Sequence, residues 1–428
     1  QQRQLHHQPH HLKQLRLIIF REYLTKVRNK SFLLMTLLSP LAVVVLSLVI
    51  GYLTQVNSNT KRHIQVLDLS GSFAKVFEAD AGITYSYTSE GDLSTLQKQS
   101  QKQGDYGLLY IDAQATHFEF FSEDTPSPTF LEKIQGKVEK ALFFRNLQRE
   151  NINPSQIDKA QERVKISLTN FSGDKSSETA GWLKLIFGSM AGYLLMIFIV
   201  VYGNMIMRSV IEEKVNRIVE VIISSVPART LLLGKIIGTS LVGITQFTIW
   251  LLLGGALLSF LPSLQGSVPA TADSHMLSDF ITEVNTLPLG KLSVCFLLYF
   301  IGGYLVYSAF YAMIGAAVDS ETDTQQFLLP VLTPLILAIY VGIFTVIEAP
   351  HGTVSVIFSY IPLTSSVVML MRIPFGVSWG ELLLSLGLLY AFFFLSIWVA
   401  ARIYRVGILS YGKKPSYKEL FKWMRMSN

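Results

Sequence analysis

Residues 32–53 read FLLMTLLSPLAVVVLSLVIGYL, and this stretch contains no charged residue. At a rise of 1.5 Å per residue, a helix of this length extends about 33 Å, which is enough to cross a hydrocarbon core about 30 Å thick. A chain inside lipid must satisfy its own backbone hydrogen bonds. The stretch is therefore predicted to be a transmembrane helix.

Five more stretches of about twenty residues or longer also lack charged residues. They are residues 185–207, 236–260, 292–318, 327–347 and 382–401. Hydrophobic residues make up 50% of the chain and charged residues 15%, a balance typical of membrane proteins. We predict an α-helical polytopic membrane protein with six transmembrane helices, surrounded by membrane lipid.

The distribution of Lys and Arg predicts the orientation of these helices. Residues 1–31 hold seven basic residues, 208–235 hold five and 402–428 hold seven, whereas 261–291 and 348–379 hold one each. Because positive residues favour the cytoplasmic ends of spans, we expect both termini and the 208–235 loop to be cytosolic. The protein is then a multi-pass protein of the plasma (inner) membrane.

The segment between the first two spans, residues 54–184, is expected on the extracytoplasmic side. It carries fifteen basic and seventeen acidic residues, and long domains translocate regardless of charge. Strand-like and helix-like patterns alternate in it, which predicts a small α/β domain. The predicted strands cover residues 63–69, 83–88, 106–111, 117–121 and 163–168.

Outside the first span and the α/β domain, three further regions are expected. Residues 1–31 form a cytosolic tail with an amphipathic interfacial helix, residues 185–404 form the five-helix transmembrane region, and residues 405–428 form a basic cytosolic tail. Within the five-helix region, residues 353–377 are apolar but interrupted by Pro362 and Pro374. Proline disrupts a helix interior, so this stretch is expected to form re-entrant or interfacial segments at the outer face.

Sequence signals for catalysis are missing. The chain has no G-x-x-x-x-G-K-[ST] phosphate loop, no H-E-x-x-H and no G-x-S-x-G. The six uncharged stretches also lack the ionisable residues that ion-coupled carriers commonly place in the membrane. We therefore expect no catalytic, cofactor or metal site in this chain and no nucleic-acid partner, and we expect any transport energy to come from another subunit.

Residues 209–225 are predicted to form an amphipathic cytosolic helix. Ile211, Val215, Ile218 and Ile222 recur at helical spacing as one apolar stripe. The other faces carry five charged residues: Glu212, Glu213, Lys214, Arg217 and Glu220. Such a helix is either a docking lever for a soluble partner or an interfacial connector between two spans, and the residues favour neither.

The next cytosolic loop is short and acidic, with Asp319, Glu321 and Asp323. These carboxylates are either a second contact for a basic partner or residues that stabilise the N-terminus of the following helix, where negative charge is favourable.

These motifs resemble a known family. The EEK…R…EVIISS run of residues 212–225, followed by LLLGK at 231–235, is similar to the signature of ABC exporter permeases of the type-2 class. More particularly, these residues are similar to the NatB-like sodium-efflux permeases. Further agreeing stretches are AAVDSETDTQQ (316–326), IPLTSS (361–366) and RIYRVGILSYGKKP (402–415).

The resemblance implies a homo- or heterodimer of two permease halves that assembles with separate ATP-binding cassette ATPase subunits. Those subunits would bind ATP and Mg²⁺ and would contact the loop around residues 212–220. The resemblance also points to Na⁺ efflux. Oxygen ligands for Na⁺ could come from a polar cluster in the third span, although such residues more often hydrogen-bond neighbouring helices. The cluster consists of Thr239, Ser240, Thr245, Gln246 and Thr248.

A different class of function also fits the domain order. A membrane-anchored sensor would bind a ligand with its outer domain and signal through the cytosolic helix at 209–225. The exporter and the sensor differ in whether the chain requires an ATPase partner.

Overall fold

The computed structural model describes residues 8–59, 61–80, 82–173, 175–265, 272–410 and 416–426. The contacts divide the chain into two compact units. The first, the membrane unit, comprises Gln1–Pro40 and Ser167–Asn428, and the second, the sheet unit, comprises Leu41–Ile166.

Six helices among the described residues are long and apolar enough to cross a membrane. They lie at Lys30–Asn57, Glu178–Val215, Ala228–Ser263, Leu289–Ala317, Glu321–Val346 and Trp379–Gly407. Each covers one of the six predicted uncharged stretches to within one residue, so the prediction of a polytopic helical membrane protein is confirmed.

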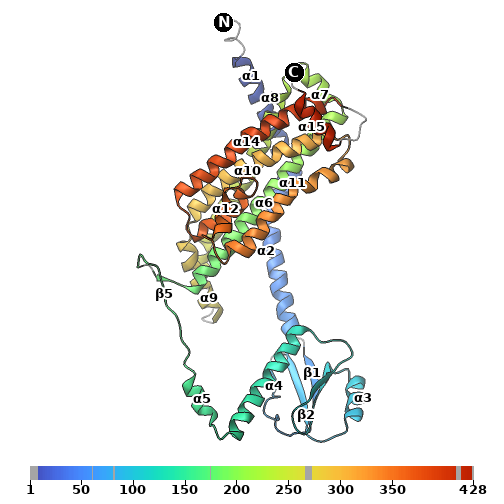
Figure 1. Cartoon of the computed structure of the whole chain (residues 1–428), viewed down its shortest axis with the longest axis vertical. Coiled ribbons are helices and arrows are strands. Elements are labelled where there is room, and N and C mark those ends of the chain that lie inside the picture. The colour runs from blue at the N-terminus through green and yellow to red at the C-terminus, as the bar shows by residue number, and fades with distance from the viewer. Residues whose placement is uncertain are drawn as a thin grey trace. The chain divides into compact units, whose positions relative to one another are not determined.

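Helix α10 (Leu289–Ala317) lies at the centre of the membrane unit (Figure 1). It packs against α6 (Glu178–Val215) and α14 (Trp379–Gly407), and most of its side chains are buried. Small residues permit the close approach: a Cβ added at Gly315 would lie 2.7 Å from the carbonyl oxygen of Met207. Glycine at helix crossings is a common device in membrane bundles, where dispersion contacts replace the hydrophobic effect.

Helices α6 and α8 (Ala228–Gln265) each contain 38 residues. At 1.5 Å per residue they extend about 57 Å, nearly twice the thickness of a hydrocarbon core. Each helix therefore continues well beyond its uncharged stretch. Charged residues of the 208–235 segment, including Glu213 and Lys235, consequently belong to the ends of long helices.

Helix α1 (Gln8–Val27) packs along α8. Gly234 and Gly238 make this packing possible, because Cβ atoms there would lie 2.3 Å from Ile18 and 2.7 Å from Glu22. Helix α2 (Lys30–Asn59) follows, and its many exposed leucines and valines suit a helix surrounded by lipid.

The apolar stretch after the fifth span folds into two short helices, α12 (Thr353–Tyr360) and α13 (Pro362–Arg372). They pack against each other, and α13 is buried against α6, α10 and α11. Helix α11 (Gln325–Val341) carries two internal prolines and continues into a π-helical turn, Gly342–Val346.

The remaining elements of the membrane unit are short. They are β5 (Leu168–Thr169), β6 (Lys175–Ser176), α7 (Ile218–Ile223), α9 (Ala272–Thr286), η1 (Glu321–Thr324), η3 (Ile373–Phe375) and α15 (Tyr417–Arg425). Helix α15 packs on α14 and buries Trp423.

The sheet unit contains a four-stranded mixed sheet with strand order β2-β1-β3-β4. The strands are β1 (Arg62–Asp68), β2 (Ile83–Thr88), β3 (Gly107–Ile111) and β4 (Phe118–Phe121). Strand β1 is parallel to β2 and β3, and β4 is antiparallel to β3. Three helices complete the unit: α3 (Leu93–Gln103), α4 (Pro128–Arg149) and α5 (Pro154–Ala160).

One helix supplies much of the core of the sheet unit. Phe130, Ile134 and Val138 recur every four residues along α4, so they share one helix face and pack with strand residues such as Val66 and Leu109. The four strands correspond to the predicted strands at 63–69, 83–88, 106–111 and 117–121.

The fifth predicted strand is wrong. Residues 163–167 have no strand structure, and only Leu168–Thr169 pairs, with Lys175–Ser176. The alternating apolar pattern there does not reflect a buried face, since Val164 and Ile166 are both exposed.

Candidate functional site

The predicted helix at 209–225 is two elements rather than one. Helix α6 ends at Val215, and α7 begins after Arg217, whose φ of 55° places it in the left-handed region. The predicted apolar stripe is broken as well, because Val215 and Ile218 are exposed while Val219 is buried. The prediction of one continuous helix is thus wrong: the chain turns at residue 217, which lets α7 bury Val219.

A buried charge cluster joins the end of α6 to α8 and α1. The ammonium group of Lys235, which is 0% exposed, lies 2.7 Å from Oε1 of Glu213 and 3.1 Å from Oε1 of Glu22. It also donates to Oγ of Ser209 at 2.8 Å. Lys26 lies 3.3 Å from the other carboxylate oxygen of Glu22. Buried charges are tolerated when they are paired in this way.

The cluster changes the ionisation of its α1 members. Burial disfavours the charged form of Glu22, but the positive charges of Lys235 and Lys26 outweigh that effect and hold its pKa below the usual value. Burial lowers the pKa of Lys26, against the attraction of Glu22. Both residues thus depend on their partners to stay charged.

Two predicted site residues contact each other directly. The ammonium of Lys214, which is 1% exposed, donates to the carbonyl oxygen of Ala316 at 2.7 Å and lies 3.4 Å from Oδ1 of Asp319. Nearby, Arg208 lies 3.8 Å from Glu321 on the surface. The end of α6 is therefore tied to the connection that follows α10.

The predicted docking residues divide into two groups. Glu213 and Lys214, which the sequence places on polar faces of the predicted helix, are buried and bind other parts of the same chain. Glu212, Arg217 and Glu220 are exposed at the end of α6 and on α7. These three remain candidates for a partner surface.

The second predicted contact is partly occupied by local interactions. The hydroxyl of Ser320 donates to Oδ2 of Asp323 at 3.2 Å, and Ser320 precedes η1, the first turn before α11. Asp323 lies in this first turn, where negative charge is favourable, although no side-chain hydrogen bond caps the turn. Glu321 is exposed beside it.

The five polar residues of α8 do not form a common ion site in this structure. The hydroxyl of Ser240 donates to the carbonyl of Ile237, and that of Thr248 donates to the carbonyl of Ile244. The remaining three contact side chains of other helices: Thr239 accepts from Lys26, Thr245 bonds with Tyr23, and Gln246 accepts from Tyr202. Within the described residues, no group of three or more His, Cys, Asp or Glu side chains is placed to hold a metal ion.

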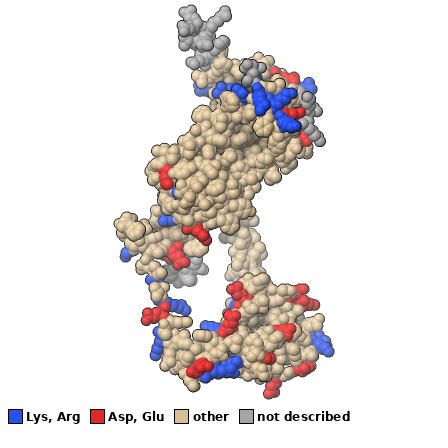
Figure 2. All heavy atoms as spheres, viewed as in Figure 1, with Lys and Arg blue, Asp and Glu red and all other residues tan. Residues whose placement is uncertain are grey.

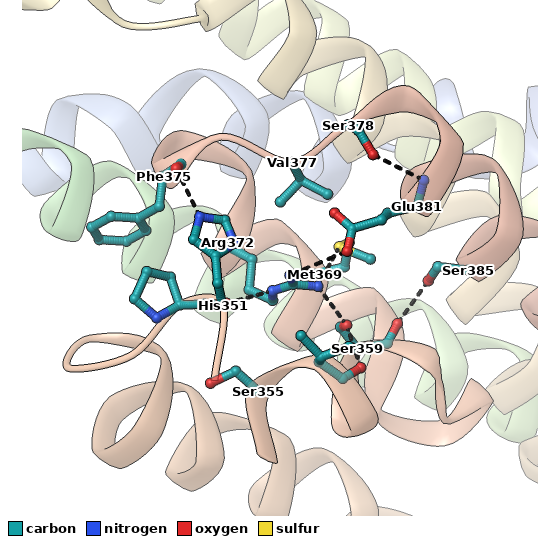
Figure 3. Close-up of polar contacts among 12 residues, drawn as sticks. His351, Ser355, Ser359, Met369, Arg372, Phe375, Val377, Ser378, Glu381 and Ser385 are labelled. Atoms are coloured by element: carbon teal, nitrogen blue, oxygen red, sulfur yellow. Dashed lines mark hydrogen bonds and ion pairs between the residues drawn. The ribbon is translucent and has the colours of Figure 1, made fainter. Parts of the chain in front are cut away.

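A second buried charge organises the α12–α13 region (Figure 3). Arg372 is fully buried; its Nε donates to the carbonyl of Pro350 at 2.7 Å, and Nη1 donates to Oγ of Ser359 at 2.8 Å. Its Nη2 lies 3.8 Å from Oε1 of Glu381 on α14. Ser385 of α14 donates to the carbonyl of Ser359 at 2.7 Å. One guanidinium thus fastens two short helices to α14.

The sequence analysis missed three of these residues. Lys235 lies one position before an uncharged stretch, Glu22 lies on a helix interpreted as interfacial, and Arg372 is a lone charge in an apolar region. The available signal was their isolation, because a single charge beside long apolar runs must find a buried partner or reach water.

The geometry defines a class of protein: a polytopic helical membrane protein whose long helices are joined at one end by buried ion pairs. The sequence pattern of the "ABC-2 family transporter protein" family matches residues 30–402. The chain belongs to this family of membrane components of ABC transporters.

Two relatives match along nearly their full length. An uncharacterised protein, YhaP, of Bacillus subtilis (strain 168) is 24% identical over 95% of this chain and 97% of its own. An uncharacterised protein of Methanocaldococcus jannaschii is 23% identical over 96% of each chain. A crystal structure provisionally described as an ABC transporter domain from Porphyromonas gingivalis W83 matches at 17% identity. It covers 28% of this chain and 94% of that one, and at a TM-score of 0.21 it carries no argument.

Proposed function

We propose that this chain is one permease half of an ATP-driven exporter and that a separate ATP-binding cassette subunit docks on α7 and the adjoining end of α6. Family membership supports the permease role. The docking surface would comprise Glu212, Arg217 and Glu220, which are exposed and charged. Two such halves, identical or different, would assemble with two ATPase subunits that bind ATP and Mg²⁺.

The proposal rests on the buried contacts that hold the C-terminal end of α6. The neighbouring residues Glu213 and Lys214 bind Lys235 of α8 and the Ala316–Asp319 connection after α10. A force applied to α7 would therefore be transmitted through short, buried contacts to three long helices, α6, α8 and α10. A simple connector between two spans would not need them.

The proposed orientation places both termini in the cytosol and the sheet unit outside. Figure 2 supports it, because Lys and Arg gather at the end of the membrane unit that carries α1 and α15. Cysteine substitutions at the exposed positions Gln101 and Lys418 test it with an impermeant thiol reagent applied to intact cells. The proposed orientation predicts labelling at position 101 only. Labelling at position 418 only would show the opposite orientation. Cys295 is buried and gives little background.

The ATPase partner is testable by purification. The chain isolated in mild detergent should recover an ATP-binding cassette protein, and ATP turnover should follow that protein rather than this chain. Turnover by this polypeptide after the partner has been stripped away would contradict the proposal.

Na⁺ is the cargo to test first, on the resemblance to NatB-like permeases. The expected result is ATP-dependent Na⁺ movement in inside-out vesicles that hold both subunits, with no K⁺ movement at the same concentration. ATP-driven movement of other solutes with no Na⁺ flux would support the exporter function and contradict Na⁺ as the cargo.

A further inference from the structure

A cavity of about 550 Å³ opens between the start of α8 and the last turns of α14. Pro227, Ala228 and Arg229 line one side, and residues from Phe394 to Arg405 line the other. Met426, just after α15, closes one end. The cavity belongs to the end of the membrane unit where basic residues gather (Figure 2).

The polar end of this cavity is entirely cationic. Arg229, Arg402 and Arg405 line it, and no Asp or Glu is among the lining residues. Among the residues that the structure describes, none of these guanidinium groups lies within 4.0 Å of a carboxylate oxygen. Arg402 is held in place: it donates to the carbonyl of Met424 at 3.2 Å and lies 3.9 Å from the ring centroid of Trp398. Three arginines without acidic partners favour an anion, because guanidinium groups match phosphate oxygens in geometry and charge.

The other end of the cavity is apolar and exposed. Phe394 and Trp398 are 68% and 52% exposed, and they lie four residues apart on the face of α14 that also carries Arg402. From residue 394 to residue 402 the helix rises about 12 Å. The site therefore offers an apolar platform and a cationic end at a separation that suits an amphiphile, with its acyl chain along α14 and its headgroup at the arginines.

We propose that this cavity binds an anionic phospholipid of the adjoining leaflet. A free phosphate would satisfy the arginines but leave the aromatic platform uncovered. A zwitterionic lipid would bring a cationic group to a site that is lined by three arginines and by no acidic residue. The first turn of α8, whose backbone N–H groups are unsatisfied within the helix, adds positive potential beside Arg229.

A bound lipid would hold α8 and α14 together at the end of the membrane unit beside α7. Pro227 lies four residues after the end of α7 and directly precedes α8, so a headgroup between Arg229 and Arg405 would fix the start of α8 against α14. This inference rests on the membrane placement of α8 and α14 and does not require the proposed ATPase partner. It can therefore fail or succeed separately.

The test uses the full chain in a neutral detergent and measures the shift of thermal unfolding on titration with phosphatidylglycerol, phosphatidylcholine or sodium phosphate. The double variant Arg229→Gln, Arg405→Gln leaves the hydrogen bond from Arg402 to Met424 intact. Both substituted residues are exposed, so the variant should still fold. The matched control, Lys13→Gln with Lys418→Gln, removes the same charge from exposed positions outside the cavity.

Phosphatidylglycerol alone should stabilise the wild-type protein. Its apparent affinity should fall about tenfold or more in the arginine variant and stay within about twofold in the control. Trp398→Ala, which keeps all three arginines, should also weaken binding. Equal losses in both charge variants would indicate general attraction to a basic surface and overturn the proposal. Equal stabilisation by phosphatidylcholine, or by sodium phosphate, would overturn it as well.

Discussion

Lys235 Nζ lies 2.7 Å from Glu213 Oε1, in a place where Lys235 has no exposed surface. The two residues come from different long helices, α8 and α6, and they meet beside Glu22 of α1. The pair thus links three helices that are separated in sequence, at the end of the bundle where the proposed ATPase partner would dock.

Replacing Lys235 by Met should destabilise the protein strongly. Glu213 would remain buried without its cation and Glu22 would keep only Lys26, and breaking a buried ion pair in this way costs about 3–5 kcal/mol. The triple variant Lys235→Met, Glu213→Gln, Glu22→Gln removes three of the four charges, leaves Lys26 bonded to Thr239, and should recover much of the loss. Thermal unfolding in detergent measures both. A single variant no less stable than the triple variant would show that the cluster is not a network.

Glu213→Lys and Glu220→Lys should behave differently. Glu213→Lys places a second cation against buried Lys235, so membrane abundance should fall. Glu220 is exposed on α7, and surface changes alter stability by about ±0.5 kcal/mol, so abundance should hold while recovery of the ATPase subunit drops. Glu132→Lys, at an exposed position of the sheet unit, is the control. Normal complex recovery with Glu220→Lys would remove α7 as the docking element.

Gly315→Ala should destabilise the helix bundle. The new Cβ would lie 2.7 Å from the backbone oxygen of Met207, which cannot move without shifting α6, and overpacking of this kind costs about 1–3 kcal/mol. Gly387→Ala, also within a long helix, meets nothing within 4 Å and should leave stability unchanged or raise it. Unfolding temperatures of the two variants make the comparison, and an equal effect would contradict close packing at residue 315.

Arg372→Lys should lose stability although it keeps the charge. A lysine ammonium cannot reproduce the separate bonds that Nε and Nη1 make to Pro350 and Ser359. Arg372→Met should lose more, because it also leaves Glu381 without its cation. Limited proteolysis near α12 and thermal unfolding should rank the variants wild type, Lys, Met. Equal stability of Lys and Arg at this position would show that only the charge matters.

Acidification should weaken the contact of α1 with α8. The pKa of Glu22 is lowered in the folded protein, so its stabilising contribution is complete above the ordinary glutamate pKa and is lost as pH falls through the lowered value. Glu22→Gln should reduce the fall in the free energy of unfolding that occurs as the pH is lowered. Glu348→Gln, an exposed acid in the same unit, should not. Identical acid limbs in wild type and Glu22→Gln would contradict this assignment.

Local pattern was sufficient for the transmembrane helices and the four strands of the sheet. Uncharged runs of twenty residues leave a membrane helix as the stable state, since the backbone has no other partner in lipid. Alternating apolar residues similarly predicted the main strands. The same reasoning failed at 163–168, where alternation exists without a buried face.

Tertiary structure decided which charged residues are available to a partner. In the sequence, Glu212, Glu213 and Lys214 look equivalent, yet Glu212 faces water while the next two bind Lys235 and the Ala316–Asp319 connection. The break at Arg217 has the same origin, because helix periodicity alone continues through it. The sequence by itself determined where the chain crosses a membrane, which depends on each segment's own transfer from water to lipid. Some of the contacts of the buried charges join residues far apart in the chain, 102 positions for Lys214 and Ala316 and 213 positions for Glu22 and Lys235, and only the packed bundle brings them together.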